Sequence, residues 1–147
     1  NTNDINLYDD AMILYSNDIY ETFNANTDPS FIVKNGRELA VLKTGKYKFY
    51  CGKHKNKYNA LRAYPEGVVL PCTRNGKDST CRFINIHKGG MTPSSAGVTW
   101  SEGCPSIPSN QWRDFIETVY RIMRYKGLKT VDFLLIDNDE MLKIIQN

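Results

Sequence analysis

The chain has 147 residues, of which 41% are hydrophobic and 12% aromatic, and its formal net charge is +3. This length is typical of a single domain, residues 1–147, which buries roughly 68–70% of its unfolded surface without needing a metal or a disulfide framework. No apolar run approaches the ~20 residues that a transmembrane helix needs, so we expect no membrane span. A basic and apolar leader is not visible at the N-terminus, and we expect synthesis without a secretion signal, or a leader left out of this sequence.

The first half of the chain predicts two pairs of short β-strands. Residues 11–15 and 19–23 are rich in β-forming side chains and are separated by a Ser-Asn-Asp turn. Residues 38–42 and 46–51 form a second expected pair around Thr44-Gly45. The alternation of apolar and polar residues in 46–51 indicates a strand with one wetter face.

A further strand is predicted over residues 80–87, and it ends at a histidine. Gly89-Gly90 follows, which we expect to end the strand and to leave room beside the imidazole. Residues 91–100 are rich in Ser, Thr, Gly and Pro, and this composition predicts a loop of the kind that forms the mouth of a site.

The C-terminal part predicts two helices and a strand. Ser109 is the expected N-cap of a long helix with apolar residues at helical spacing, and Gly127 is its expected stop. Residues 130–136 predict a buried strand, and Asn138 is the expected cap of a short helix to Ile145. The predicted fold class is therefore α+β: a mostly antiparallel β-sheet or sandwich with one long helix and one short C-terminal helix.

Charge is distributed unevenly along the chain. Residues 1–33 contain six acidic residues and no Lys or Arg, whereas residues 39–65 contain seven basic residues and no acid. One interpretation is a solvated hairpin that packs near an acidic edge. The other is a basic rim that binds an anionic polymer such as a bacterial wall. The segment has no recognised nucleic-acid motif, so we expect no nucleic-acid partner.

The four cysteines lack the spacing of a metal site. No Cys-x2-Cys pair is present and the two histidines are far from ligand spacing, so we expect no zinc and no other cofactor. We interpret Cys51, Cys72 and Cys81 as structural residues and expect free thiols.

The segment Trp100-Ser101-Glu102-Gly103-Cys104 contains the residues that are most informative about chemistry. A cysteine that follows a glycine in a tight turn can present its sulfur outward, and the N–H groups of Gly103 and Cys104 can then face an oxyanion. His87 lies 17 positions upstream and can accept the thiol proton, which would turn Cys104 into a nucleophile.

The pattern His87-x13-Ser101-x-Gly103-Cys104 resembles the signature of the L,D-transpeptidase (YkuD-type) catalytic domain. Nearly the whole chain is similar to a phage and prophage, endolysin-like branch of that family, with the block Ile84 to Gly90 and the segment from Gly103 to Trp112 among the matching stretches. The resemblance implies an L,D-transpeptidase-like fold. It implies Cys104 as nucleophile and His87 as general base, and a backbone carbonyl beside the histidine, from Lys88 or Gly89, as the group that orients the ring.

Candidate substrate contacts come from two places in the chain. Those beside the cysteine are Trp100 as a wall of the pocket, Ser101, and Glu102, which stands where the family usually has a second histidine. A second cluster contains His54, Tyr58 and Arg62, and the fork of Arg62 suits a substrate carboxylate. For Ser101 a turn-building role, and for Glu102 and Arg62 an ordinary surface role, remain open alternatives.

These observations predict a cysteine peptidase that acts on peptidoglycan stem peptides, an L,D-carboxypeptidase or L,D-endopeptidase. The resemblance implies a phage endolysin or a virion-associated wall hydrolase. Such an enzyme would be made in the bacterial host cytoplasm, act on the wall as a monomer, or be carried in the virion. Two alternatives stay open, an L,D-transpeptidase that crosslinks peptidoglycan and an inactive wall-binding module. The bond that is cut, the host and the oligomeric state are not determined by these patterns.

Overall fold

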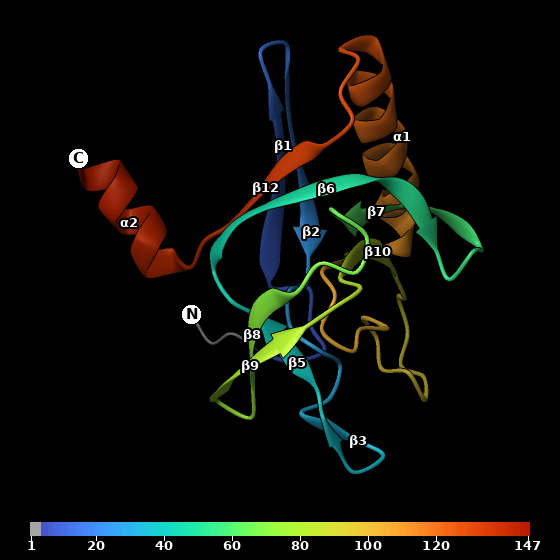
Figure 1. Cartoon of the computed structure of the whole chain (residues 1–147), viewed down its shortest axis with the longest axis vertical. Helices are drawn as coiled ribbons and strands as arrows, with labels where there is room; N and C mark the ends of the chain where they lie inside the picture. The colour runs from blue at the N-terminus through green and yellow to red at the C-terminus, as the bar shows by residue number, and fades with distance from the viewer. Residues whose placement is uncertain (1–3) are drawn as a thin grey trace.

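A computed structural model describes residues 4–147, which form a mainly β structure with two helices (Figure 1). The strands of the N-terminal half are β1 (Asp10–Ser16), β2 (Ile19–Ala25), β3 (Val33–Lys34), β4 (Arg37–Glu38), β5 (Ala40–Leu42), β6 (Gly45–His54) and β7 (Tyr58–Ala63). The C-terminal half contains β8 (Leu70–Arg74), β9 (Lys77–Cys81), β10 (Asn85–Gly89), β11 (Ser106–Pro108), α1 (Ser109–Tyr125), β12 (Val131–Leu135) and α2 (Asn138–Gln146).

The strands are arranged in two larger sheets and two hairpins. The five-stranded sheet has the order β11-β10-β7-β6-β12, and the three-stranded sheet has the order β5-β8-β9. All pairings are antiparallel except that of β10 with β11, which is parallel. In Figure 1 the long strand β6 curls across the molecule. The predicted fold class, α+β with mostly antiparallel strands, is confirmed.

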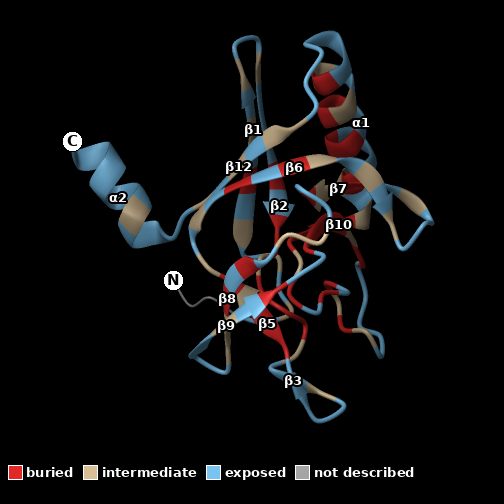
Figure 2. Cartoon of the chain, viewed as in Figure 1, coloured by how far each residue is buried: buried red, intermediate tan, exposed pale blue. Residues whose placement is uncertain are grey.

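The core lies between α1 and the five-stranded sheet. The buried side chains of α1 recur at helical spacing and include Trp112, Phe115, Ile116, Val119 and Met123. They pack with residues such as Phe49 and Ile86 of the sheet in one apolar cluster. Figure 2 shows this burial in red on α1 and around β5 and β10, whereas α2 stands apart and has no buried residue. Neither helix of the described residues is long and apolar enough to cross a membrane.

The predicted strand positions are largely right, but one predicted strand pair and the continuity of one predicted strand are wrong. Residues 38–42 and 46–51 do not pair with each other, because β5 joins β8 whereas β6 joins β7 and β12. The predicted strand 80–87 is interrupted, since Phe83 adopts a left-handed conformation (φ 57°) between β9 and β10. The alternation of apolar and polar residues indicates which residues are extended, but it carries little information about which strand pairs with which.

Three predictions at the C-terminal end are also corrected. Pro108, not Ser109, is the N-cap of α1, and Asp137, not Asn138, caps α2 through a capping box with Glu140. Residues 131–135 alternate between half-buried and exposed instead of being buried throughout, as suits the outermost strand of a sheet. Gly127 does end α1 in a left-handed conformation (φ 64°), and residues 91–100 form a loop without helix or strand, both as predicted.

The glycine pair after His87 serves packing between loops, which differs from the predicted role of leaving room beside the imidazole. A Cβ atom on Gly89 would collide with the hydroxyl of Tyr8 and would lie 2.8 Å from the backbone oxygen of Thr99. A Cβ on Gly90 would lie 2.5 Å from the indole of Trp100. The two glycines therefore let the N-terminal segment and the 91–100 loop approach β10 closely.

We predict that Gly89→Ala destabilises the fold by about 1–3 kcal/mol, because a backbone atom cannot move aside as a flexible side chain can. Gly52→Ala is the matched control, since the three atoms nearest to its Cβ belong to the side chains of Arg62 and Tyr50 and none is a backbone atom. Denaturant unfolding of both variants measures the difference. A loss no larger for Gly89→Ala than for Gly52→Ala would contradict the close packing described here.

Candidate active site

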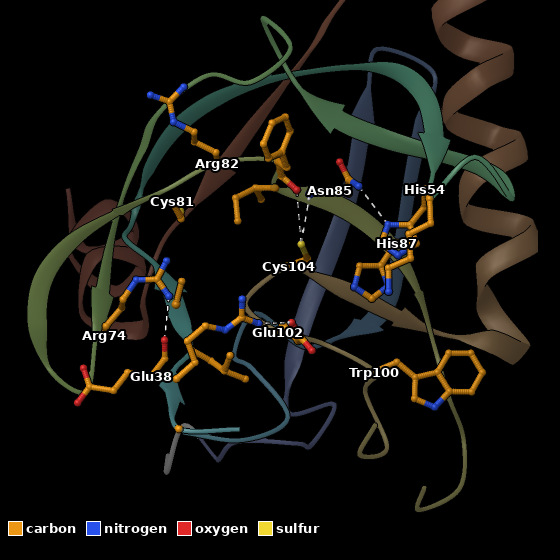
Figure 3. Close-up of a pocket in the computed structure, with 17 residues that line it drawn as sticks. Glu38, His54, Arg74, Cys81, Arg82, Asn85, His87, Trp100, Glu102 and Cys104 are labelled. Atoms are coloured by element: carbon orange, nitrogen blue, oxygen red, sulfur yellow. Dashed lines mark hydrogen bonds and ion pairs between the residues drawn. The ribbon is translucent and has the colours of Figure 1, made fainter. Parts of the chain in front are cut away.

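One cavity of about 830 Å³ contains both the predicted nucleophile and the predicted base (Figure 3). Its lining comes from the β3–β4 turn, the start of β5, the β6–β7 turn, the link between β9 and β10, and the loop before β11. Cys104 and His87 are therefore brought to the same surface by segments that are far apart along the chain.

Cys104 is held in a tight turn by the hydroxyl of Ser101. The Ser101 Oγ accepts the N–H of Gly103 at 3.0 Å and donates to the carbonyl oxygen of Cys104 at 2.7 Å. The Cys104 sulfur is half-buried and accepts a long hydrogen bond from the Asn85 N–H at 3.5 Å. In Figure 3 the sulfur points into the cavity. The turn therefore presents the thiol to any molecule that enters.

Only glycine fits before this cysteine. Gly103 has φ 126°, a conformation that side chains with a Cβ rarely adopt, and an added Cβ would collide with the carbonyl oxygen of Ala40. The turn thus lies directly against the first residue of β5. This contact joins the nucleophile to the three-stranded sheet.

His87 lies on β10 and its side chain is oriented by a main-chain carbonyl. The parallel pairing of β10 with β11 sets His87 opposite Ser106, two residues after Cys104. The backbone N–H of His87 donates to the carbonyl oxygen of Pro105 at 3.1 Å. The His87 Nδ1 lies 2.8 Å from the carbonyl oxygen of Lys88. Because a carbonyl only accepts hydrogen bonds, Nδ1 carries the proton and Nε2 keeps the lone pair that a general base needs.

A second histidine ring stacks on the first. The rings of His54 and His87 are 4.5 Å apart between centroids and 21° from parallel. His54 lines the cavity, and its Nδ1 lies 3.0 Å from the side-chain amide nitrogen, Nδ2, of Asn85. His54, placed among the substrate contacts by the sequence, thus also packs against the base and restricts the plane of its ring.

Burial favours the neutral forms of both His87 and Cys104 when no substrate is bound. Burial lowers the pKa of His87 to about 4, although the bond to the Lys88 carbonyl acts in the opposite direction. Burial, together with the charge on His87, also lowers the pKa of His54 to about 4. Burial raises the pKa of the Cys104 thiol, while the Asn85 N–H and the Lys55 charge act against that rise. At neutral pH the cavity is therefore lined by a neutral thiol and a neutral imidazole.

Two more of the predicted substrate contacts line the cavity beside His54. Trp100 is 44% exposed and forms part of the wall, as its position beside the motif suggested. Glu102 also lines the cavity, but its carboxylate is paired with Lys34 at 2.9 Å and Arg37 at 3.2 Å. The hydrogen bond from Lys34 lowers the pKa of Glu102. Glu102 therefore ties the β3–β4 hairpin to the nucleophile turn, and its charge is compensated.

Three other candidates lie outside the cavity. Arg62 does not line the cavity, and its charge is paired with that of Glu66 at 2.8 Å. Tyr58 packs edge-on against Trp112, and its hydroxyl is 3.5 Å from the Lys88 carbonyl oxygen. Ser101 is 1% exposed and its hydroxyl is used within the turn. These side chains do not line the cavity, so we do not expect them to contact a substrate.

The oxyanion donors also differ from the expectation. The N–H of Gly103 is taken by Ser101 Oγ, so it does not face the cavity as predicted. Among residues 4–147, no hydrogen bond involves the N–H of Cys104, and this donor remains for an oxyanion.

The structure adds cavity residues that the sequence did not indicate, namely Arg74, Arg82, Asn85 and Lys55. Arg74 ends β8 and Arg82 follows β9, and both occupy ordinary surface positions in the sequence pattern. No local signal distinguishes them, because their approach to Cys104 depends on the packing of the two sheets.

The basic segment is partly paired with carboxylates, and no ion pair among residues 4–147 involves Lys53, Lys55 or Lys57. Lys46 and Lys48 both pair with Asp132 of β12, and Lys43 pairs with Asp78. These contacts fit a solvated hairpin near acidic residues for the paired lysines, and the interpretation of a basic rim stays open for Lys53, Lys55 and Lys57. The acids come from the C-terminal half of the chain, whereas the sequence pattern suggested the N-terminal edge.

Comparisons with protein-family models, with curated proteins and with solved structures found no match to this chain. Within the part of the chain that the structure describes, no group of three or more His, Cys, Asp or Glu side chains is placed to hold a metal ion. The geometry of the cavity and the resemblance of the sequence motif are therefore the two indications of function.

We predict that the free energy of unfolding decreases as pH falls from 6.5 to about 4. In this window the histidines of the unfolded chain bind protons, at an ordinary pKa of about 6.5, whereas the buried His87 does not. His87 contributes a slope of up to about 1.4 kcal/mol per pH unit, and the half-buried His54 contributes less. Denaturant titrations of the wild type and His87→Gln measure this slope. An unchanged slope in His87→Gln would contradict the burial of a neutral imidazole.

We also predict that alkylation of Cys104 by iodoacetamide accelerates steadily between pH 6 and pH 9. The thiolate is the reactive form, and a raised pKa makes its fraction grow about tenfold for each pH unit in this range. Peptide mass spectrometry resolves Cys104 from the exposed Cys51, which serves as the internal control. A rate plateau below pH 7 that is lost in His87→Gln would instead demonstrate a thiolate–imidazolium pair.

Proposed function

We propose that this chain is a cysteine peptidase that hydrolyses stem peptides of bacterial peptidoglycan, as an L,D-carboxypeptidase or L,D-endopeptidase. The observation that carries this proposal is the shared cavity of Cys104 and His87, in which the His87 tautomer leaves Nε2 free to accept a proton. The choice of peptidoglycan as substrate comes from the resemblance of the motif to the endolysin-like branch of the L,D-transpeptidase family.

The first chemical step forms a thioester. The Cys104 sulfur attacks the carbonyl carbon of the peptide bond while Nε2 of His87 takes the thiol proton. The Cys104 N–H donates to the developing oxyanion. Since the resting pair is uncharged, proton transfer accompanies the attack instead of preceding it.

The second role of His87 is that of an acid. When the tetrahedral intermediate collapses, the imidazolium returns its proton to the leaving amine and the peptide C–N bond breaks. A buried imidazolium with a pKa of about 4 is a strong donor for this transfer. Water then attacks the thioester, His87 accepts a proton from that water, and Cys104 leaves as a thiol.

Water is the expected acceptor in this site. A transpeptidase must exclude water and bind a second peptide as its acceptor. The 91–100 loop beside the cavity is short and polar, and its residues 91–95 are exposed to solvent. Glu102 is occupied by Lys34 and Arg37, so it does not offer a free carboxylate to an acceptor amine. The proposed role is therefore that of a wall hydrolase used in phage lysis or carried in a virion.

We predict that the wild-type protein converts tetrapeptide muropeptides to tripeptides, with the mass loss of one D-alanine. Cys104→Ala and His87→Ala should each lower the rate roughly 10³-fold or more, as for other members of a catalytic unit. Cys51→Ser is the matched control, because this cysteine lies outside the cavity and should retain activity. Mass spectrometry of the products, with thermal unfolding of each variant, provides both readouts.

Several results would contradict this proposal. Activity of Cys104→Ala at the wild-type rate would exclude the nucleophile, and activity that EDTA removes and zinc restores would exclude the cysteine mechanism. Crosslinked dimers, or exchange of D-methionine into the fourth position, would move the protein to the transferases. Cleavage at the sugar–peptide amide would refute both forms of the proposal.

A further inference from the structure

The cavity has two arms on either side of Cys104. In Figure 3, His54 and His87 lie on one side of the sulfur, and Arg74 with Glu38 lies on the other. Arg82 also lines the cavity, from the link between β9 and β10. We call the part lined by Arg74 and Arg82 the arginine arm. The proposed reaction uses the histidine side and leaves the arginine arm without a role.

Arg74 is held in place by main-chain oxygens. Its Nη1 donates to the carbonyl of Glu38 at 2.9 Å, and its Nη2 lies 3.4 Å from the carbonyl oxygen of Thr80. A guanidinium has five N–H donors, so most of its fork remains for a ligand. Carbonyl partners also orient the group without neutralising its charge. The side chain is therefore pre-organised for an anion.

The nearby carboxylates do not compensate this charge. The Glu38 carboxylate accepts a hydrogen bond from Asn75 at 3.1 Å, and Glu102 is paired with Lys34 and Arg37. Within residues 4–147, the ion pairs include neither Arg74 nor Arg82. Arg82 is likewise anchored by a carbonyl, that of Gly67 at 2.9 Å. Arg74 therefore keeps an unpaired positive charge in the cavity wall, whereas the exposed guanidinium of Arg82 points away from Cys104 in Figure 3.

We propose that the arginine arm binds a free carboxylate on the acyl-donor half of the substrate peptide. This inference rests on the proposed reaction, because the leaving amine must lie beside His87 to receive its proton. The acyl half then extends past Cys104 in the opposite direction, toward Arg74. An arginine fork recognises a carboxylate through two parallel hydrogen bonds, which a carboxamide cannot match in charge or in acceptor number.

The protein should therefore discriminate between two forms of one stem peptide. One form has free carboxyl groups on the residues before the scissile bond, and the other has those groups as carboxamides. The wild type should cleave the free-acid peptide with a kcat/KM about tenfold or more above that of the carboxamide, as expected for a hydrogen bond to a charged group. Arg74→Gln should bring the ratio close to one by lowering only the free-acid value.

The control is Arg121→Gln, which removes the same charge from the exposed face of α1, outside the cavity, and should keep the wild-type ratio. Thermal unfolding of each variant establishes that it is folded. If Arg74→Gln does not fold, Arg74→Lys makes the same test, because it keeps the charge but loses the planar fork and should also lower the ratio. Equal cleavage of the two peptides by the wild type, or an unchanged ratio in the folded Arg74 variant, would overturn the proposal.

A binding measurement separates this inference from the proposed reaction. Calorimetry with Cys104→Ala, which keeps the arginine arm, should give tighter binding of the free-acid peptide by about tenfold or more. Adding Arg74→Gln should remove that difference. This pattern without any cleavage by the wild type would sustain the carboxylate site and refute the hydrolase. Cleavage of both peptides with no difference in binding would refute only the carboxylate site.

Discussion

The candidate site depends on the turn in which the Ser101 hydroxyl joins the N–H of Gly103 to the carbonyl of Cys104. Both bonds are short-range, so the turn forms with little loss of chain entropy beyond its own residues. The turn then lies against Ala40, where only a glycine fits at position 103. Because β11 follows at once and pairs with β10, the same turn places the sulfur near His87. The short segment 101–108 therefore positions the nucleophile, the base and the two sheets relative to one another.

Burial of this site has an electrostatic consequence. An imidazolium and a thiolate are both costly to desolvate, and the carbonyl of Lys88, the long contact of the Asn85 N–H and the charge of Lys55 do not offset this cost. The neutral forms of His87 and Cys104 are accordingly favoured. The charged pair is needed only during the reaction, when the substrate and its oxyanion change the surroundings. The stacked ring of His54 also has a pKa lowered to about 4, by burial and by the charge on His87, so both rings are neutral at neutral pH.

Charge is placed differently on the surface and in the cavity. Lys46 and Lys48 of β6 meet the single carboxylate of Asp132 across the sheet edge, which compensates part of their charge. In the arginine arm, Arg74 and Arg82 are oriented by carbonyl oxygens and keep their positive charge. Lys46 and Lys48 lie outside the cavity and are paired with a carboxylate, whereas Arg74 lines the cavity and has no such pair. This difference favours an anionic group on the ligand over a general attraction to anionic polymers.

The sequence by itself determined the mostly antiparallel α+β class, the extent of α1 to Gly127 and the pairing of residues 11–15 with 19–23, because these depend on neighbours a few positions apart. It also indicated His87 and Cys104, since a Ser-x-Gly-Cys turn is a local pattern. Only the tertiary structure decided that β5 and β6 belong to different sheets and that Arg74, not Arg62, enters the cavity. Strand partners and the direction of a surface arginine depend on long-range packing, which leaves no periodic signal in the chain.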